Sequence, residues 1–189
     1  MKRLDQIILI GTFLGFCWLG MQLVHEFGHV LGALCTGGEV EKVVAHPFTI
    51  SRTDLSHNPH PLIVVWMGPV IGSVLPAAAF FVARLLRSPG LYLFRFFAGF
   101  CLVTNGAYIG IGSFQKVMDA GDMMRHGSPQ WTLIVFGIAA VAAGLWMWNS
   151  LGSKFGLGDT KGKVDRRATV ASAILFAAIF IVELVIGSR

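Results

Sequence analysis

Residues 6–34 read QIILIGTFLGFCWLGMQLVHEFGHVLGAL and contain one charged side chain, Glu26. A helix crosses a bilayer with about 20 mostly apolar residues, so this stretch is long enough to span a membrane. The preceding Met1, Lys2 and Arg3 are typical of the start of a signal peptide. The apolar run is too long for a signal peptide, however, and no small-residue cleavage pattern closes it. We therefore expect a retained transmembrane helix.

The composition of the whole chain points to the same class of protein. Of its 189 residues, 54% are hydrophobic and 13% are charged, whereas soluble domains carry about 25% charged residues. The Lys and Arg residues behind the net charge of +5 form no continuous basic face, which argues against a nucleic-acid partner. Three cysteines without paired spacing argue against a disulfide framework. We expect an integral, multi-pass protein of the plasma membrane, embedded in the lipid bilayer.

Further apolar runs predict four more spans, at about 61–86, 91–114, 130–150 and 168–186. Pro69 and Pro76 are expected to kink or interrupt the second span, and the glycine-rich residues 106–112 to disrupt the end of the third. Between the first two spans, β-branched residues in 40–51 predict a short strand or hairpin. The expected fold is an all-α polytopic membrane protein of about five transmembrane helices, with a short β-hairpin or re-entrant segment after the first. It forms a single transmembrane domain over residues 1–189.

The distribution of Lys and Arg predicts the orientation of these spans, because cytoplasmic loops carry an excess of both. With the N-terminus in the cytoplasm, the cationic residues on that side outnumber those outside by about two to one. The smaller, outer set is Lys42, Arg52, Lys116, Arg125 and Arg189. This orientation places the C-terminal end of the first span toward the outside.

Residues 25–29, inside the first span, read HEFGH and form an H-E-x-x-H motif. Positions i and i+4 share one helix face, so His25 and His29 can reach one tetrahedral metal ion. Glu26 can approach a metal-bound water and act as its general base. With 6 His in the chain, random placement produces this motif about 0.004 times. The structural alternative is a set of polar groups hydrogen-bonded between helices or lining a proton path.

A catalytic zinc ion has three protein ligands and a water, so a third ligand must come from elsewhere in the chain. Asp119 and Asp122 are the best candidates, because they follow the third span and are predicted to lie on the same side of the membrane as His29. The alternatives on that side are the loop histidines His46, His57 and His60.

The chain resembles the intramembrane zinc metalloproteases of the site-2 protease class. Three features carry the resemblance: the motif at 25–29, Gly68-Pro69 in the second span, and the sequence MDAG at 118–121. In that family the last block reads approximately L-D-G and its Asp completes the zinc site, which implies Asp119 as the third ligand and leaves Asp122 as the alternate. Asn105 lies upstream, as an Asn often does in that block, which implies a substrate-binding residue. The resemblance covers about residues 4–129, while the two helices in about 130–189 contribute no motif.

The resemblance implies a zinc-dependent endopeptidase that cleaves membrane-embedded or juxtamembrane protein substrates. Glu26 would be the catalytic residue, and Zn²⁺ the cofactor held by His25, His29 and Asp119. It also implies that a hairpin in 40–51 pairs with an unwound substrate strand, which is physically sensible because a helix hides its scissile carbonyl in its own hydrogen bonds. An ordinary extended loop is the alternative for this segment.

The side of the membrane that holds the metal site and the class of function both have alternatives. Most members of the family keep zinc nearer the cytosolic leaflet, whereas the charge distribution here places His29 toward the outside. The alternative function, from a different class, is a non-proteolytic zinc-binding scaffold or a metal or proton transporter. A transporter needs ionisable residues in several spans, and the second and fourth spans have almost none.

Overall fold

The computed structural model describes residues 2–187. The elements are, in order, α1 (Lys2–Cys35), β1 (Glu39–Val44), β2 (Arg52–His57), α2 (Pro61–Leu85), α3 (Leu91–Gln115), α4 (Met118–Arg125), α5 (Gln130–Trp148), the 3₁₀ turns η1 (Gly152–Phe155) and η2 (Gly158–Thr160), and α6 (Arg166–Gly187). In this part of the chain, α1, α2, α3, α5 and α6 are long and apolar enough to cross a membrane. The predicted helical class with a β-hairpin after the first helix is confirmed, and the five helices indicate a multi-pass membrane protein. Met1 and Arg189, which entered the signal-peptide and charge arguments, lie outside the described residues.

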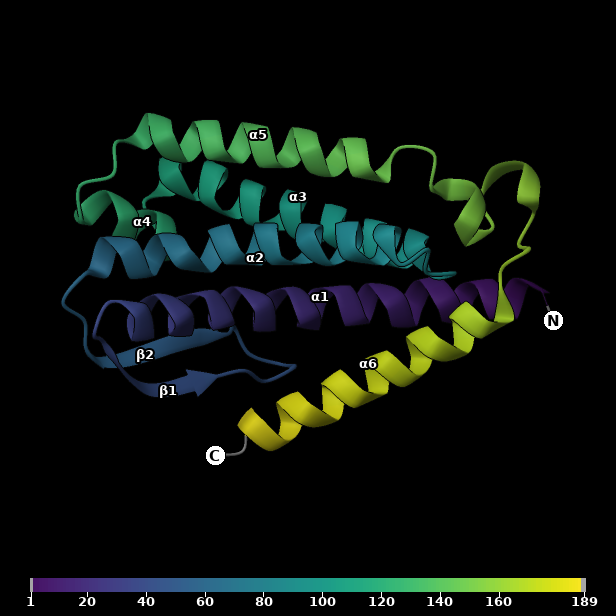
Figure 1. The fold of residues 1–189 in the computed structure, drawn as a ribbon, viewed down its shortest axis with the longest axis horizontal. Helices are drawn as coiled ribbons and strands as arrows, with labels where there is room; N and C mark the ends of the chain where they lie inside the picture. Colours follow the sequence, from purple (N-terminus) through teal and green to yellow (C-terminus); the bar gives the residue numbers. More distant parts are fainter. Residues whose placement is uncertain (1, 188–189) are drawn as a thin grey trace.

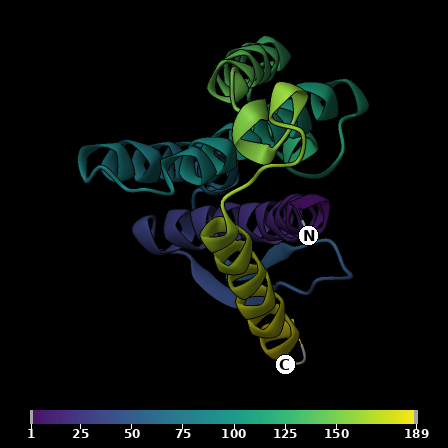
Figure 2. The same ribbon diagram turned by 90° about the vertical axis from the view of Figure 1, so that its right-hand side faces the viewer.

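Helix α1 is the central element of the fold. It lies against α2 on one side and α6 on another, while α3 packs between α2 and α5. Figure 1 shows the β-hairpin and α4 at one end of the bundle, and the start of the chain with the 3₁₀ turns at the other. Helix α6 crosses α1 obliquely and leans away from the other helices (Figure 2). The end that carries the hairpin and α4 is also the end to which α1 delivers its H-E-x-x-H motif.

Helix α3 continues without a break through residues 106–112, so the predicted disruption of this segment is wrong. Its glycines permit a close approach to α5. A Cβ added to Gly106 would lie 2.8 Å from the Cβ of Ala140 and 3.0 Å from the carbonyl oxygen of Gly137. Small residues of this kind let two helix backbones pack closely in a membrane, and here they serve packing rather than helix termination.

Helix α2 likewise runs unbroken through Pro69 and Pro76, so the interruption expected from these prolines does not occur. Both prolines are buried, together with Gly68, Gly72 and Ser73. Proline inside a transmembrane helix is tolerated where the neighbouring helices support the segment, and α1 and α3 flank α2 here.

The β-hairpin confirms the predicted strand segment but extends beyond it. Strands β1 and β2 pair antiparallel, with Val40 opposite Leu55 and Val43 opposite Thr53. The prediction ended at Ser51, whereas the second strand runs from Arg52 to His57. This strand was missed because its sequence, RTDLSH, is mainly polar and shows no β-branched run.

The helix that carries Asp119 is anchored by a small apolar core. Ala120 and Met123 on α4 are buried against Ile109 on α3 and Leu133 on α5. These contacts hold the short helix α4 against the end of the bundle, so that its first turn lies beside the H-E-x-x-H motif of α1.

Candidate metal centre

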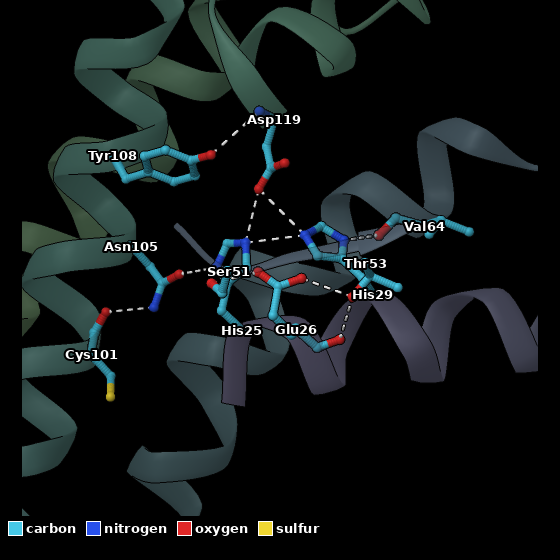
Figure 3. Close-up of polar contacts among 10 residues, drawn as sticks. All are labelled: His25, Glu26, His29, Ser51, Thr53, Val64, Cys101, Asn105, Tyr108 and Asp119. Carbon is cyan, nitrogen blue, oxygen red and sulfur yellow. Dashed lines mark hydrogen bonds and ion pairs between the residues drawn. The ribbon is translucent and has the colours of Figure 1, made fainter. Parts of the chain in front are cut away.

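Three side chains from two distant segments converge at the hairpin end of the bundle. The Nε2 atoms of His25 and His29 lie 3.1 Å apart. Asp119 Oδ2 lies 2.8 Å from the first nitrogen and 3.4 Å from the second (Figure 3). Both histidines are buried, with exposed fractions of 7% and 8%. Of the groups of His, Cys, Asp and Glu in the described residues, this set has the geometry to hold a metal ion.

The spacing of the three atoms fits a zinc ion. Zn–N and Zn–O bonds of about 2.0–2.2 Å in tetrahedral geometry place neighbouring ligand atoms about 3.3 Å apart. The three separations here, 2.8, 3.1 and 3.4 Å, lie close to that value. A donor set of two imidazoles and one carboxylate is typical of catalytic zinc, which keeps its fourth position for water.

Hydrogen bonds from the Nδ1 atoms, on the side of each ring away from the three converging atoms, orient both imidazoles. Nδ1 of His25 donates to Asn105 Oδ1 at 2.6 Å, and Nδ1 of His29 donates to the carbonyl oxygen of Val64 at 3.0 Å. We assign these tautomers from the partners, because both partner atoms are acceptors. Each neutral imidazole then presents the lone pair of its Nε2 to the centre, as in metal sites whose histidines are held by an outer acceptor.

The negative charge of Asp119 also favours a cation at this centre. Burial alone would raise the pKa of this carboxyl, but the two imidazoles, when they are protonated at Nε2, donate to it and lower its pKa well below the ordinary value. Asp119 is therefore a carboxylate at neutral pH. Unless an imidazole takes up a second proton, three acceptor atoms face one another at contact distance, an arrangement that favours a bound cation.

The other candidates for the third ligand lie apart from this cluster. Asp122, one helical turn after Asp119, forms an ion pair with Arg125 at 2.5 Å. It lines the same cavity but does not join the group of converging ligand atoms. The loop histidines, His46, His57 and His60, are also outside that group.

Two glycines let α1 and α2 approach closely at the histidines. A Cβ on Gly68 would overlap the ring of His29 and lie 2.9 Å from Nε2 of His25. A Cβ on Gly28 would lie 2.8 Å from Cα of Gly68 and would overlap the carbonyl of Met67. The sequence identified Gly68 through the resemblance alone, and the structure supplies a physical reason for glycine at this position.

Glu26 lies beside the histidines and contacts the β-hairpin. Its exposed fraction is 4%. Its two carboxylate oxygens accept hydrogen bonds from the hydroxyls of Ser51 and Thr53, both at 2.8 Å (Figure 3). The sequence analysis missed both hydroxyl residues. The available signal was the alternation of Ser51 and Thr53 at i and i+2, which places two side chains on one side of an extended strand.

These residues line an open cavity of about 810 Å³ at the hairpin end of the fold. Its wall includes Trp18 and Gln22 of α1, Tyr108 of α3 and Ile50 of the hairpin loop. Trp18 of α1 and Ile50 of the hairpin loop are exposed at 53% and 67%, so the cavity extends from the buried histidines to the apolar surface at these two residues.

Asn105 supports His25, one of the three candidate metal ligands. It is 1% exposed; its Oδ1 accepts from His25, and its Nδ2 donates to the carbonyl of Cys101 at 2.9 Å. Its amide is thus engaged on both sides, and the substrate-binding role implied for it stays a prediction.

Asn105→Ala is expected to weaken zinc binding by about 10–100-fold, the range measured when an outer partner of a metal ligand is lost. The reason is that His25 would lose the acceptor that fixes its tautomer and ring. A competition titration with a zinc chelator measures the change. The control is Thr104→Ala, because the neighbouring Thr104 also lines the cavity but donates to the carbonyl of Phe100. Equal zinc affinity in the Asn105→Ala variant and the wild type would contradict this role.

Neither a protein-family model, nor a curated protein, nor a solved structure matches this chain. Its function is therefore inferred from the residues of the site and their geometry.

Proposed function

We propose that this protein is a zinc-dependent endopeptidase of the membrane. The observation that carries the proposal is the triangle of His25 Nε2, His29 Nε2 and Asp119 Oδ2 beside the buried Glu26. A sequence with five membrane-length helices pays a penalty for each buried ionisable group, and such groups are typical of functional sites. Here three of them, His25, Glu26 and His29, meet in one cavity with the partly exposed Asp119.

Each residue has a distinct role in this mechanism. His25, His29 and Asp119 would hold the metal, and Asn105 and Val64, which accept from the Nδ1 atoms of the two histidines, would keep the imidazoles directed at it. A zinc ion bound there would supply a Lewis acid for the scissile carbonyl and would lower the pKa of a bound water to about 7. Glu26 accepts the proton from the attacking water and delivers it to the leaving amine.

The proposed substrates are membrane-embedded or juxtamembrane segments of other proteins. The cavity supports this class, because it joins the metal ligands to the apolar outer surface. The hairpin supports it as well: a two-stranded sheet leaves one edge of each strand unpaired, and such an edge can hold an extended peptide. The proposed setting is the plasma membrane, and a cytoplasmic N-terminus is proposed from the excess of Lys and Arg on that side.

Glu26→Gln is expected to keep zinc at the wild-type level and to lose cleavage at least about 100-fold, because a general base contributes about 10²–10⁴-fold to the rate. Cells producing either protein would be compared by quantitative mass spectrometry of their membrane-protein fragments, with metal analysis of the purified proteins. Glu41→Gln, at an exposed carboxyl of β1, is the matched control.

Unchanged fragments in Glu26→Gln cells, relative to active wild type, would rule out this mechanism. A wild-type protein that binds zinc but produces no fragments relative to cells lacking it would instead support the zinc-binding scaffold or transporter.

A further inference from the structure

The partners of the Glu26 carboxylate come from the β-hairpin. Ser51 Oγ donates to Oε1 and Thr53 Oγ1 donates to Oε2, each at 2.8 Å. The two hydroxyls thus contact opposite oxygens of one carboxylate (Figure 3). Two such bonds restrain the plane of the carboxylate. Ser51 and Thr53 follow Glu26 by 25 and 27 positions in the chain. Their contacts with Glu26 therefore depend on how the hairpin folds back over α1.

Residues 51–54, which comprise the start of β2 and the residue before it, have two different faces. Ser51 and Thr53 alternate with Arg52 and Asp54, and successive side chains of a strand point to opposite sides. Arg52 Nε contacts Asp54 Oδ2 at 3.1 Å on the more exposed side. This ion pair on one face and the hydroxyls on the other define which side of the strand meets Glu26.

Burial makes these hydrogen bonds important for Glu26. A carboxylate that is only 4% exposed is unfavourable unless donors replace its lost water. The two hydroxyls act as such donors. Each carboxylate oxygen can accept at two positions, so one position on each oxygen stays available for the proton of a water. Thr53 is well suited to this task, because a β-branched side chain has few rotamers.

We propose that Ser51 and Thr53 are positioning residues that hold the Glu26 carboxylate in the orientation needed for proton transfer. The same bonds attach the hairpin to α1 above the metal ligands. A hairpin that shifts on binding a substrate would therefore also move the general base. The catalytic part of this inference rests on the proposed endopeptidase function, whereas the attachment of the hairpin is independent of it.

The attachment is tested by hydrogen exchange of the zinc-loaded protein in detergent. The Ser51→Ala/Thr53→Val double variant is expected to increase amide exchange in residues 45–53. Glu26→Ala should give a similar increase, and adding the double variant to it should add little, because all these changes remove the same bonds. Ser56→Ala is the control, since Ser56 lies on the same strand but contacts Glu39 at 3.4 Å. Independent, additive effects would overturn the attachment.

The catalytic part is tested on the membrane protein whose fragments depend most strongly on Glu26. The double variant is expected to lower kcat about tenfold, a part of the about 10²–10⁴-fold contribution of a general base, with KM and zinc content unchanged. Thr53→Val keeps the shape of the side chain and Thr53→Ser keeps the hydroxyl. The proposal requires Thr53→Ser to be more active than Thr53→Val; the reverse order, or a change in KM alone, would overturn it.

The two proposals fail in different ways. If Glu26→Gln abolishes cleavage while the double variant cleaves normally, the endopeptidase function stands and the positioning role is overturned. If Glu26→Gln leaves the fragments unchanged while hydrogen exchange shows the coupling, the hairpin attachment stands and the endopeptidase function fails.

Discussion

Replacing Gly68 by alanine is expected to abolish zinc binding, and cleavage with it. The added methyl group would occupy the position of the His29 ring and approach Nε2 of His25. A shift of α2 away from α1 would relieve this overlap only by opening the close contact of Gly28 with Met67 and Gly68. Since interiors are packed with little free space, the imidazoles must rotate away from Asp119, and the triangle of ligand atoms is lost.

Metal analysis and a chelator competition on the purified variant measure this effect. Gly11→Ala is the matched control: it is the same substitution in α1, and a Cβ there meets nothing within 4 Å. Circular dichroism and size-exclusion chromatography of both variants establish that they fold, because overpacking alone costs about 1–3 kcal/mol. A folded Gly68→Ala protein that binds zinc as tightly as the wild type would show that the close approach of α1 and α2 does not define the site.

The transmembrane helices were predictable because their signal is local. A bilayer requires a certain length of apolar sequence, and the runs at 61–86, 91–114 and 130–150 end within two residues of the observed helices α2, α3 and α5. The spacing within 25–29 is local as well, because helix geometry alone places His25 and His29 on one face.

The sequence-based predictions that were wrong or incomplete concern features that tertiary packing determines. The glycines of 106–112 weaken a helix in isolation, but α5 lies against them and makes them part of a close helix contact. Strand β2 has little intrinsic preference for its conformation and forms by pairing with β1. Ser51 and Thr53 could not be linked to Glu26 from the sequence, because nothing in the spacing shows where the hairpin folds back.

The choice between Asp119 and Asp122 illustrates the same limit. Both lie on α4, three positions apart, and the sequence kept both as candidates. The structure separates them by their partners: Asp119 contacts the two histidines, while Asp122 is paired with Arg125. The deciding factor is the packing of α4 on α3 through Ala120 and Met123, which sets the rotation of this short helix.

Asp119→Ala is expected to weaken zinc binding by more than the about 10–100-fold lost with an outer partner, because it removes a ligand atom itself and leaves two imidazoles to hold the ion. Asp122→Ala is the matched control and should bind zinc like the wild type, since it loses only the ion pair with Arg125. Zinc content and chelator competition, measured side by side on both variants, separate the two carboxylates.

Asp119→Asn tests whether the charge of the third ligand is needed. It keeps the size of the side chain and removes its charge, so it should also bind zinc weakly. If Asp122→Ala lost the zinc and Asp119→Ala kept it, helix α4 would have to shift or turn so that Asp122 faces the histidines in place of Asp119. If neither variant lost zinc, the third ligand would have to come from elsewhere, with the loop histidines as the next residues to replace.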